Sequence, residues 1–158
     1  MEIKEVKDNK KQFLSLLLLA DEQENMIEKY IDRGIMYVLD DEGIIKAECI
    51  ITDEQNGVLE IKNLAVKPEY QRKGYGKFLI SISYELSKIE KRIGTPERPL
   101  SDLGRQSYLA WWTQAIIEYI REAKDQGRSF TLEEMSKDTA IRVEDIVDSL
   151  ENVKLIRK

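Results

Sequence analysis

The 158-residue chain contains no histidine, and this absence alone excludes several kinds of active site. Neither a Ser-His nor a Cys-His nucleophile pair can form, and zinc sites that use histidine are excluded as well. Acid–base chemistry must therefore be carried out by Glu, Asp, Lys or Tyr side chains. We expect no bound metal.

Cysteine is almost as scarce, because Cys49 stands alone and no disulfide can form within the chain. This favours a reducing compartment, either the cytoplasm or the nucleus. Long apolar runs are also missing: the mainly apolar residues 13–20 are far fewer than the about 18 that a membrane helix needs. Residues 1–4 have no secretory pattern. We therefore expect an intracellular protein that does not bind membranes.

The chain also has no excess of positive charge. The chain has 25 Lys and Arg against 30 Asp and Glu, a net charge of −5. Non-specific binding of nucleic acid depends on neutralising phosphates, so this balance disfavours it, and it mildly favours a cationic substrate. The length predicts about one domain, or one core with a small appendage.

The most informative segment that is present is Gln-Arg-Lys-Gly-Tyr-Gly-Lys at residues 71–77. It follows a strand-like run at 58–66, and helical spacing begins directly after it. Gly74 and Gly76 let the backbone approach a ligand closely, and the free N–H groups of the first helical turn then face that ligand. Positive charge at the same point comes from Arg72, Lys73 and Lys77. The pattern predicts a site for an anionic diphosphate.

This order of strand, turn, Gln-x-x-Gly-x-Gly and helix resembles motif A of the GNAT acetyltransferase superfamily, which holds the pyrophosphate of acetyl-CoA. The preceding Leu-Ala-Val-Lys-Pro-Glu-Tyr at 64–70 is also typical of that superfamily. The glycine pattern fits neither the dinucleotide fingerprint nor a P-loop. The resemblance implies acetyl-CoA as co-substrate, held by ten residues: Leu64, Ala65, Val66, Gln71, Arg72, Lys73, Gly74, Tyr75, Gly76 and Lys77.

The N-terminal part has the element order of a GNAT core. Alternation predicts a first strand at 2–7, and helical spacing predicts helices at 9–20 and 22–32, with Asp21 as the N-cap of the second. Turn signals then separate three antiparallel strands, at 35–39, 44–52 and 58–66. On a regular strand, Glu60, Lys62 and Leu64 would share one face, opposite Ile61 and Asn63.

From about Ser83 onward the chain resembles a different branch, the MYST family of histone lysine acetyltransferases. Three groups of residues carry this resemblance: Ser-Tyr-Glu-Leu-Ser-Lys at 83–88, Gly-Thr-Pro-Glu-Arg-Pro-Leu-Ser-Asp-Leu-Gly at 94–104, and Ser107-Tyr108 with Trp112. The resemblance implies transfer of acetyl from acetyl-CoA to lysine side chains of proteins such as histones.

The C-terminal half is predicted to be mainly helical. We expect a helix at 75–92, a stiff proline-containing loop at 94–102, and further helices at 104–125, after the capping box at Thr131, and at 143–152. A strand at 153–156 would complete a small winged helix-turn-helix. The last helix is acidic, so direct DNA binding is not expected. Trp111 and Trp112 are adjacent on one helix, and we expect only Trp112 in the core.

The chain therefore reads as an acetyltransferase chimera of α/β (α+β) class. Residues 1–80 resemble GNAT proteins and 81–158 resemble MYST enzymes, with the junction inside the motif A helix. We expect a GNAT-like acetyl-CoA-binding core at 1–93 and a MYST-like helical, winged-helix-like region at 94–158 that packs on it. An engineered or recombined origin is our interpretation, and an unusual natural lineage is the alternative.

Two carboxylates are candidates for the general base. The resemblance to MYST enzymes implies Glu97, which lies between Pro96 and Pro99 on a stiff backbone. The resemblance to some GNAT histone acetyltransferases implies Glu60 instead. MYST enzymes carry a cysteine at the position of Asn63, so a covalent acetyl-cysteine step has no nucleophile here.

Ser101 matches a MYST serine that contacts coenzyme A, although its hydroxyl could equally cap the next helix. Two other functions stay open at this point. One is a chimera that binds coenzyme A with little or no turnover, and the other is an acetyltransferase of small-molecule amines.

Overall fold

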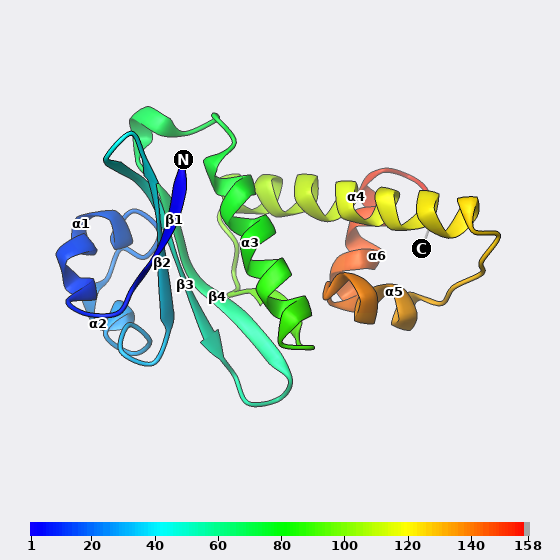
Figure 1. Cartoon of the computed structure of the whole chain (residues 1–158), viewed down its shortest axis with the longest axis horizontal. Coiled ribbons are helices and arrows are strands. Elements are labelled where there is room, and N and C mark those ends of the chain that lie inside the picture. Colours follow the sequence, from blue (N-terminus) through cyan, green and yellow to red (C-terminus); the bar gives the residue numbers. More distant parts are fainter. Residues whose placement is uncertain (157–158) are drawn as a thin grey trace.

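The computed structural model of the chain describes residues 1–156, in which one five-stranded sheet is covered by helices on both faces (Figure 1). The strands lie in sequence order: β1 (Glu2–Val6), β2 (Ile35–Asp41), β3 (Ile44–Asp53), β4 (Val58–Val66) and β5 (Ile93–Pro96). The first four pair antiparallel, and β5 pairs parallel to β4. This mixed α/β architecture confirms the expected fold class. The predicted strands at 2–7, 35–39, 44–52 and 58–66 lie within two residues of the observed ones.

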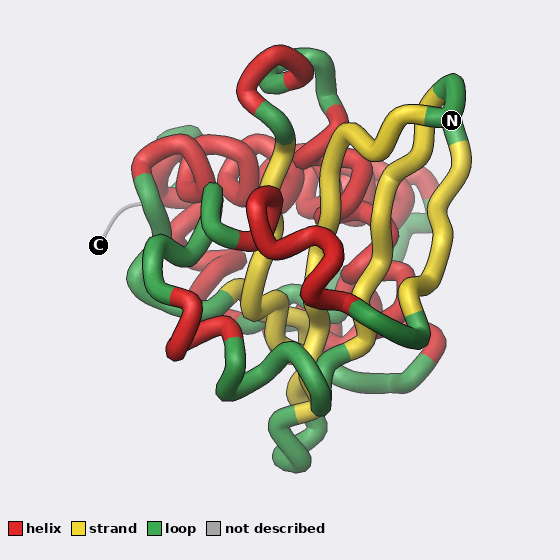
Figure 2. The backbone as a smooth tube through the Cα atoms, turned by 90° about the vertical axis from the view of Figure 1, so that its left-hand side faces the viewer, coloured by secondary structure: helices red, strands yellow, loops and turns green. Residues whose placement is uncertain are grey.

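One face of the sheet carries short helical segments instead of the two long helices expected at 9–20 and 22–32. They are η1 (Lys10–Phe13), α1 (Leu14–Leu17) and α2 (Glu24–Ile27), which cross in front of the strands in Figure 2. Backbone bonds of the i→i−3 type, such as Leu19 N–H to Leu16 O, interrupt the α-helical ladder. The apolar residues of the predicted helices are nevertheless buried: Leu17, Ile27 and Ile31 pack against the sheet. Asp21 is not the N-cap of α2, since that residue is Gln23.

The opposite face is covered by α3 (Tyr75–Ile89) and α4 (Asp102–Asp125). Both tryptophans of α4 are buried, which corrects the expectation that only Trp112 lies in the core. Trp111 stacks on Tyr84 of α3 with ring centroids 4.3 Å apart, and Trp112 Nε1–H donates to the Tyr84 hydroxyl at 2.7 Å. One tyrosine of α3 thus contacts both indoles, so adjacent positions on α4 can both be buried.

The chain ends in α5 (Leu132–Thr139) and α6 (Val143–Asn152), which pack on α4 (Figure 1). The turn between them bridges to β5, where Gly94 N–H donates to Ala140 O at 2.7 Å. The predicted capping box is present, with Thr131 and Glu134 bonded to each other's backbone N–H. Residues 153–156 form turns and bends instead of the expected strand, so a wing is not formed within the described residues.

A bulge in β4 changes which of its side chains face α3. Ile51 pairs with Ile61 but Ile50 pairs with Asn63, so Lys62 has no partner in β3. The extra residue inverts the alternation, and Ile61 and Leu64 both pack in the core beneath α3. The expectation that Glu60, Lys62 and Leu64 share a face is therefore wrong. Glu60 and Leu64 point to opposite sides of the sheet.

Candidate active site

A cavity of about 810 Å³ opens between the sheet and the start of the two long helices. This size is typical of sites for small molecules and cofactors, which span roughly 300–1,000 Å³. Its walls come from four parts of the chain: the segment around α1 and α2, strand β4, the turn before α3, and residues 96–110. Every sequence-predicted coenzyme A residue except Lys73 lines it, as does Glu97 but not Glu60.

The cavity exists because β4 and β5 separate after a short parallel pairing. Their last paired residues are Ile61 and Pro96, and the Glu97 N–H then donates to Ile61 O at 2.9 Å. Beyond that point no strand in residues 1–156 pairs with this edge of β4. The backbone groups of Leu64–Val66 that point away from β3 therefore lie on an edge that no described strand covers, where a ligand can lie.

The turn before α3 presents backbone donors to the same cavity. Gly74 is the N-cap residue with φ 87°, a left-handed conformation that favours glycine, and no side chain caps the helix there. The first N–H groups of α3 are thus open to an anion, at the positive end of the helix dipole. A Cβ on Gly76 would contact the Val66 and Leu64 side chains at 3.6 and 3.8 Å, so this glycine lies directly against the β4 edge. Gln71 closes the turn by donating from Nε2 to Val66 O at 3.1 Å.

The side chains of this turn have different environments. The Tyr75 hydroxyl donates to Asp41 at 3.0 Å and accepts from Lys46 at 3.3 Å, which fixes the start of α3 to the β2–β3 hairpin. The Lys77 ammonium donates to Gln114 of α4. Lys73 lies over the Tyr70 ring at 5.3 Å.

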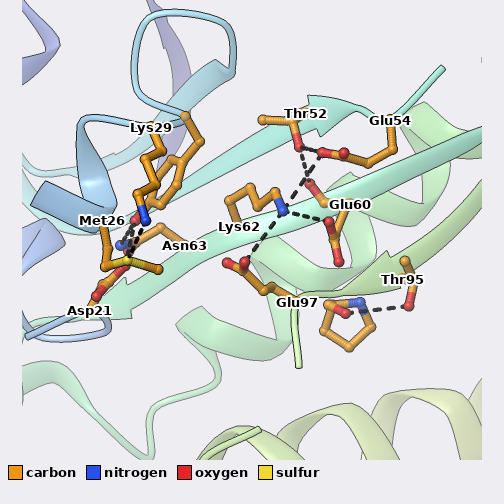
Figure 3. Close-up of polar contacts among 12 residues, drawn as sticks. Asp21, Met26, Lys29, Thr52, Glu54, Glu60, Lys62, Asn63, Thr95 and Glu97 are labelled. Carbon is orange, nitrogen blue, oxygen red and sulfur yellow. Dashed lines mark hydrogen bonds and ion pairs between the residues drawn. The ribbon is translucent and has the colours of Figure 1, made fainter. Parts of the chain in front are cut away.

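At the other end of the cavity, three carboxylates surround one ammonium group, and we call these four residues the Lys62 cluster (Figure 3). The Lys62 Nζ lies 2.6 Å from Glu60, 3.3 Å from Glu97 and 3.7 Å from Glu54. Both candidate bases thus contact the same cation, although they lie 37 residues apart in the sequence. Lys62 and Glu97 line the cavity, whereas Glu60 and Glu54 do not.

The cluster keeps Lys62 charged. Burial alone would lower the pKa of Lys62, but the hydrogen bond to Glu60 and the charges of Glu97 and Glu54 raise it above its ordinary value. Glu54 in turn accepts from the Thr52 hydroxyl and from Arg33, which lowers the pKa of its carboxyl. Sequence reasoning missed Lys62, because a bulge residue has no signal of its own in the alternating pattern of a strand.

The remaining candidates occupy less direct positions. Ser101 is the N-cap of α4, and its hydroxyl accepts from Gly104 N–H at 3.1 Å while the residue lines the cavity. Asn63 is buried on the opposite face of β4, where its Nδ2 donates to Leu17 O at 3.1 Å and to the Tyr30 hydroxyl at 2.8 Å. Cys49 is fully buried, and burial raises the pKa of its thiol to about 12. Neither residue lines the cavity.

Residues 1–156 contain neither an evident metal site nor a membrane-spanning helix. No group of three or more potential ligands is arranged to hold a metal ion. No helix in this part of the chain is long and apolar enough to cross a membrane.

Two protein families match the chain over different but overlapping ranges. The MOZ/SAS family matches residues 52–158, and the acetyltransferase (GNAT) family matches residues 8–95. Each match covers more than half of the chain. The overlap, residues 52–95, contains β4, the motif A turn and α3. The expected combination of two acetyltransferase families is thereby confirmed.

The curated relatives are MYST-family histone acetyltransferases, whereas the similar solved structures are other acetyltransferases. The histone acetyltransferase of the MYST family 2 from Arabidopsis thaliana is 52% identical over 90 residues, which are 57% of this chain and 20% of the plant protein. The chain thus spans about a fifth of the length of the curated relatives it matches.

Among solved structures, an IAA acetyltransferase from Bacillus cereus is 29% identical with a TM-score of 0.60 and covers 72% of this chain and 73% of its own. A Bacillus subtilis acetyltransferase in complex with CoA is 28% identical with a TM-score of 0.52, covering 56% and 58%.

Proposed function

The chain belongs to both the MOZ/SAS family and the GNAT acetyltransferase family, and from this premise we propose that it transfers acetyl from acetyl-CoA to a primary amine. The proposed acceptor is the ε-amine of a lysine in a protein such as a histone tail. Glu97 is the proposed general base.

The observation that carries this proposal is that one cavity joins three functional elements. It contains the uncapped N-terminus of α3, the unpaired edge of β4 and the carboxylate of Glu97. In the proposed complex, the diphosphate binds the N–H groups that follow Gly74, and the pantetheine arm lies along Leu64–Val66. The structure of a relative solved in complex with CoA supports a coenzyme A site in this fold.

The chemistry then needs one proton acceptor near the thioester. Glu97 takes a proton from the acceptor ammonium, and the nitrogen lone pair attacks the carbonyl carbon. The C–N bond forms, the C–S bond breaks, and the thiolate leaves with its electron pair. The nitrogen loses its second proton to solvent, and the thiolate takes up one proton from solvent. Transfer is direct, because Asn63 and the buried Cys49 offer no thiol to the cavity.

Lys62 has a separate part in this proposal. Its ammonium neutralises Glu97 and Glu60 while no acceptor is bound, at the place where another primary ammonium would approach the base. Glu60 remains the alternative base. It contacts Lys62 more closely than Glu97 does, but it does not line the cavity.

A small-molecule amine is a second candidate acceptor, and one observation favours it. The acceptor side of the cavity is lined by Leu19, Ala20, Asp21, Glu22 and Met26. All five lie in the range matched by the GNAT family and outside that matched by the MOZ/SAS family. The acidic pair, Asp21 and Glu22, suits a cationic amine of either kind.

The test is release of the coenzyme A thiol from acetyl-CoA in the presence of a histone-tail peptide. The matched control is the same peptide with each lysine replaced by glutamine, and a simple diamine tests the second candidate. We expect lysine-dependent release and a mass increase of one acetyl group per modified lysine. No release with either acceptor, together with tight binding of acetyl-CoA, would leave only a coenzyme A-binding protein with little or no turnover.

Two further parts of the proposal concern organisation and location. We propose that residues 1–93 form the acetyl-CoA-binding core and that residues 94–158 pack on it as a helical region. A histone acceptor would place the protein in the nucleus, whereas a small amine is equally compatible with the cytoplasm.

A further inference from the structure

Asp145 is a buried carboxylate that does not itself line the cavity. It lies in the first turn of α6 and is 1% exposed. One of its oxygens accepts a hydrogen bond from the Arg98 guanidinium, 47 residues earlier in the chain. The other oxygen has no hydrogen-bond partner among the described residues. Arg98 is thus the side chain that binds this buried charge directly.

Arg98 is the direct neighbour of the proposed base. The segment that follows β5 is attached to β4 by the backbone bond from Glu97 N–H to Ile61 O, and to α6 by the ion pair of Arg98 with Asp145. Arg98 and Glu97 both line the cavity, whereas no described residue of α5 or α6 does. The ion pair is therefore a direct polar link between the cavity wall and the last two helices.

We propose that Asp145 is a positioning residue, which holds Arg98 and thereby fixes the Glu97 segment against β4. The two terminal helices would then control the placement of the base without contacting the substrate. Only the kinetic part of this inference rests on the proposed function. A base that is displaced by about 1 Å can lose roughly a hundredfold in rate, so one ion pair suffices to matter.

The charge state of Asp145 follows from its surroundings. Burial raises the pKa of Asp145 to about 6, against the lowering effects of Arg98 and Arg142. The carboxylate is thus ionised at pH 7 and above, and its attraction for Arg98 is lost as the pH falls through about 6. The groups that face it are Arg98 from the loop, Arg142 at the N-cap of α6, Glu144 and Asp148 from α6, Tyr84 from α3 and Tyr108 from α4.

The experiment compares Asp145→Asn, Arg98→Ala and the double variant with the native chain at pH 7.5. The matched control is Glu144→Gln, an exposed acid in the same turn of α6. The first readout, which needs no activity, is hydrogen exchange of the Glu97 amide. We expect exchange about tenfold faster in both single variants and unchanged exchange in the control. In the acetylation assay, kcat should fall about 10- to 100-fold while the Kd for acetyl-CoA stays the same.

The double variant separates this role from a general effect on the stability of α6. If Asp145 acts through Arg98, the double variant should match the single ones instead of adding their effects. Additive losses, or an unchanged Glu97 amide in Arg98→Ala, would overturn the proposal. If no variant and no native protein turns over acetyl-CoA, the proposed function fails, but hydrogen exchange still decides the positioning role.

Discussion

Replacing Glu97 by glutamine is the most informative single change, because it removes a carboxylate and keeps the shape of the side chain. Glu97 is the one member of the Lys62 cluster that both lines the cavity and carries a carboxylate. The glutamine oxygen can still accept from Lys62, so the loop should keep its position. The loss should therefore come from the missing base alone.

Loss of a general base costs about 10²–10⁴-fold in rate, which corresponds to about 3 to 5 kcal/mol of transition-state stabilisation. Glu60→Gln is the matched comparison, since it neutralises the other carboxylate that contacts Lys62. Glu60 does not line the cavity, and its glutamine variant can still accept from Lys62, so we expect a loss of rate below about fivefold, far smaller than the loss of a general base. The assay is kcat for thiol release at saturating acetyl-CoA, with Kd for acetyl-CoA measured in parallel.

If Glu60→Gln is the more damaging change, the strand carboxylate is the base and Glu97 is not. Small and equal effects of both substitutions would mean that neither carboxylate is a base. Loss of acetyl-CoA binding in Glu97→Gln would show that the loop itself had moved.

Three further predictions concern stability. Burial raises the pKa of Glu48 to about 8, so the native state keeps a proton that the unfolded chain loses above about pH 4.5. The free energy of unfolding should therefore fall as the pH rises from 5 to 8. Glu48→Gln should flatten this pH dependence in denaturant titrations, and the same pH dependence in variant and native chain would contradict the prediction. Trp112→Phe removes the hydrogen bond to the buried Tyr84 hydroxyl and should cost about 1–3 kcal/mol in unfolding free energy, whereas native-like stability would show that the bond contributes nothing. A chain that ends at residue 92 loses β5 and α4 and exposes the side of α3 that packs on α4, including Tyr84, so it should be insoluble or lack a cooperative melt. A sharp melting transition would refute the packing described above.

The sequence predicted local structure best where a backbone conformation strongly favours one residue type. The capping box at Thr131 and the glycine at position 74 were identifiable because helix termini and left-handed backbone demand those residues. The strand bounds followed from alternation and turn signals. The placement of the predicted coenzyme A residues around one cavity could be anticipated only through the family resemblance.

What could not be predicted depends on the backbone departing from regular geometry. The bulge at Lys62 changes the face of every later residue in β4, and an alternating pattern carries no sign of it. Residues 9–32 have helical spacing, but packing against the sheet selects short turns that bury the same side chains. The contact of Trp111 with Tyr84 depends on where α3 lies relative to α4, which is a tertiary property.

The central claim is that acetyl-CoA binds at the turn before α3, and calorimetric titration tests it directly. The native chain should bind one acetyl-CoA per molecule, and a variant with Gly74 and Gly76 both replaced by leucine should show no binding. Gly127→Ala is the control, because Gly127 also has a positive φ but lies outside the cavity. The control should bind like the native chain. Equal affinity of the native chain and the folded double variant would contradict the account.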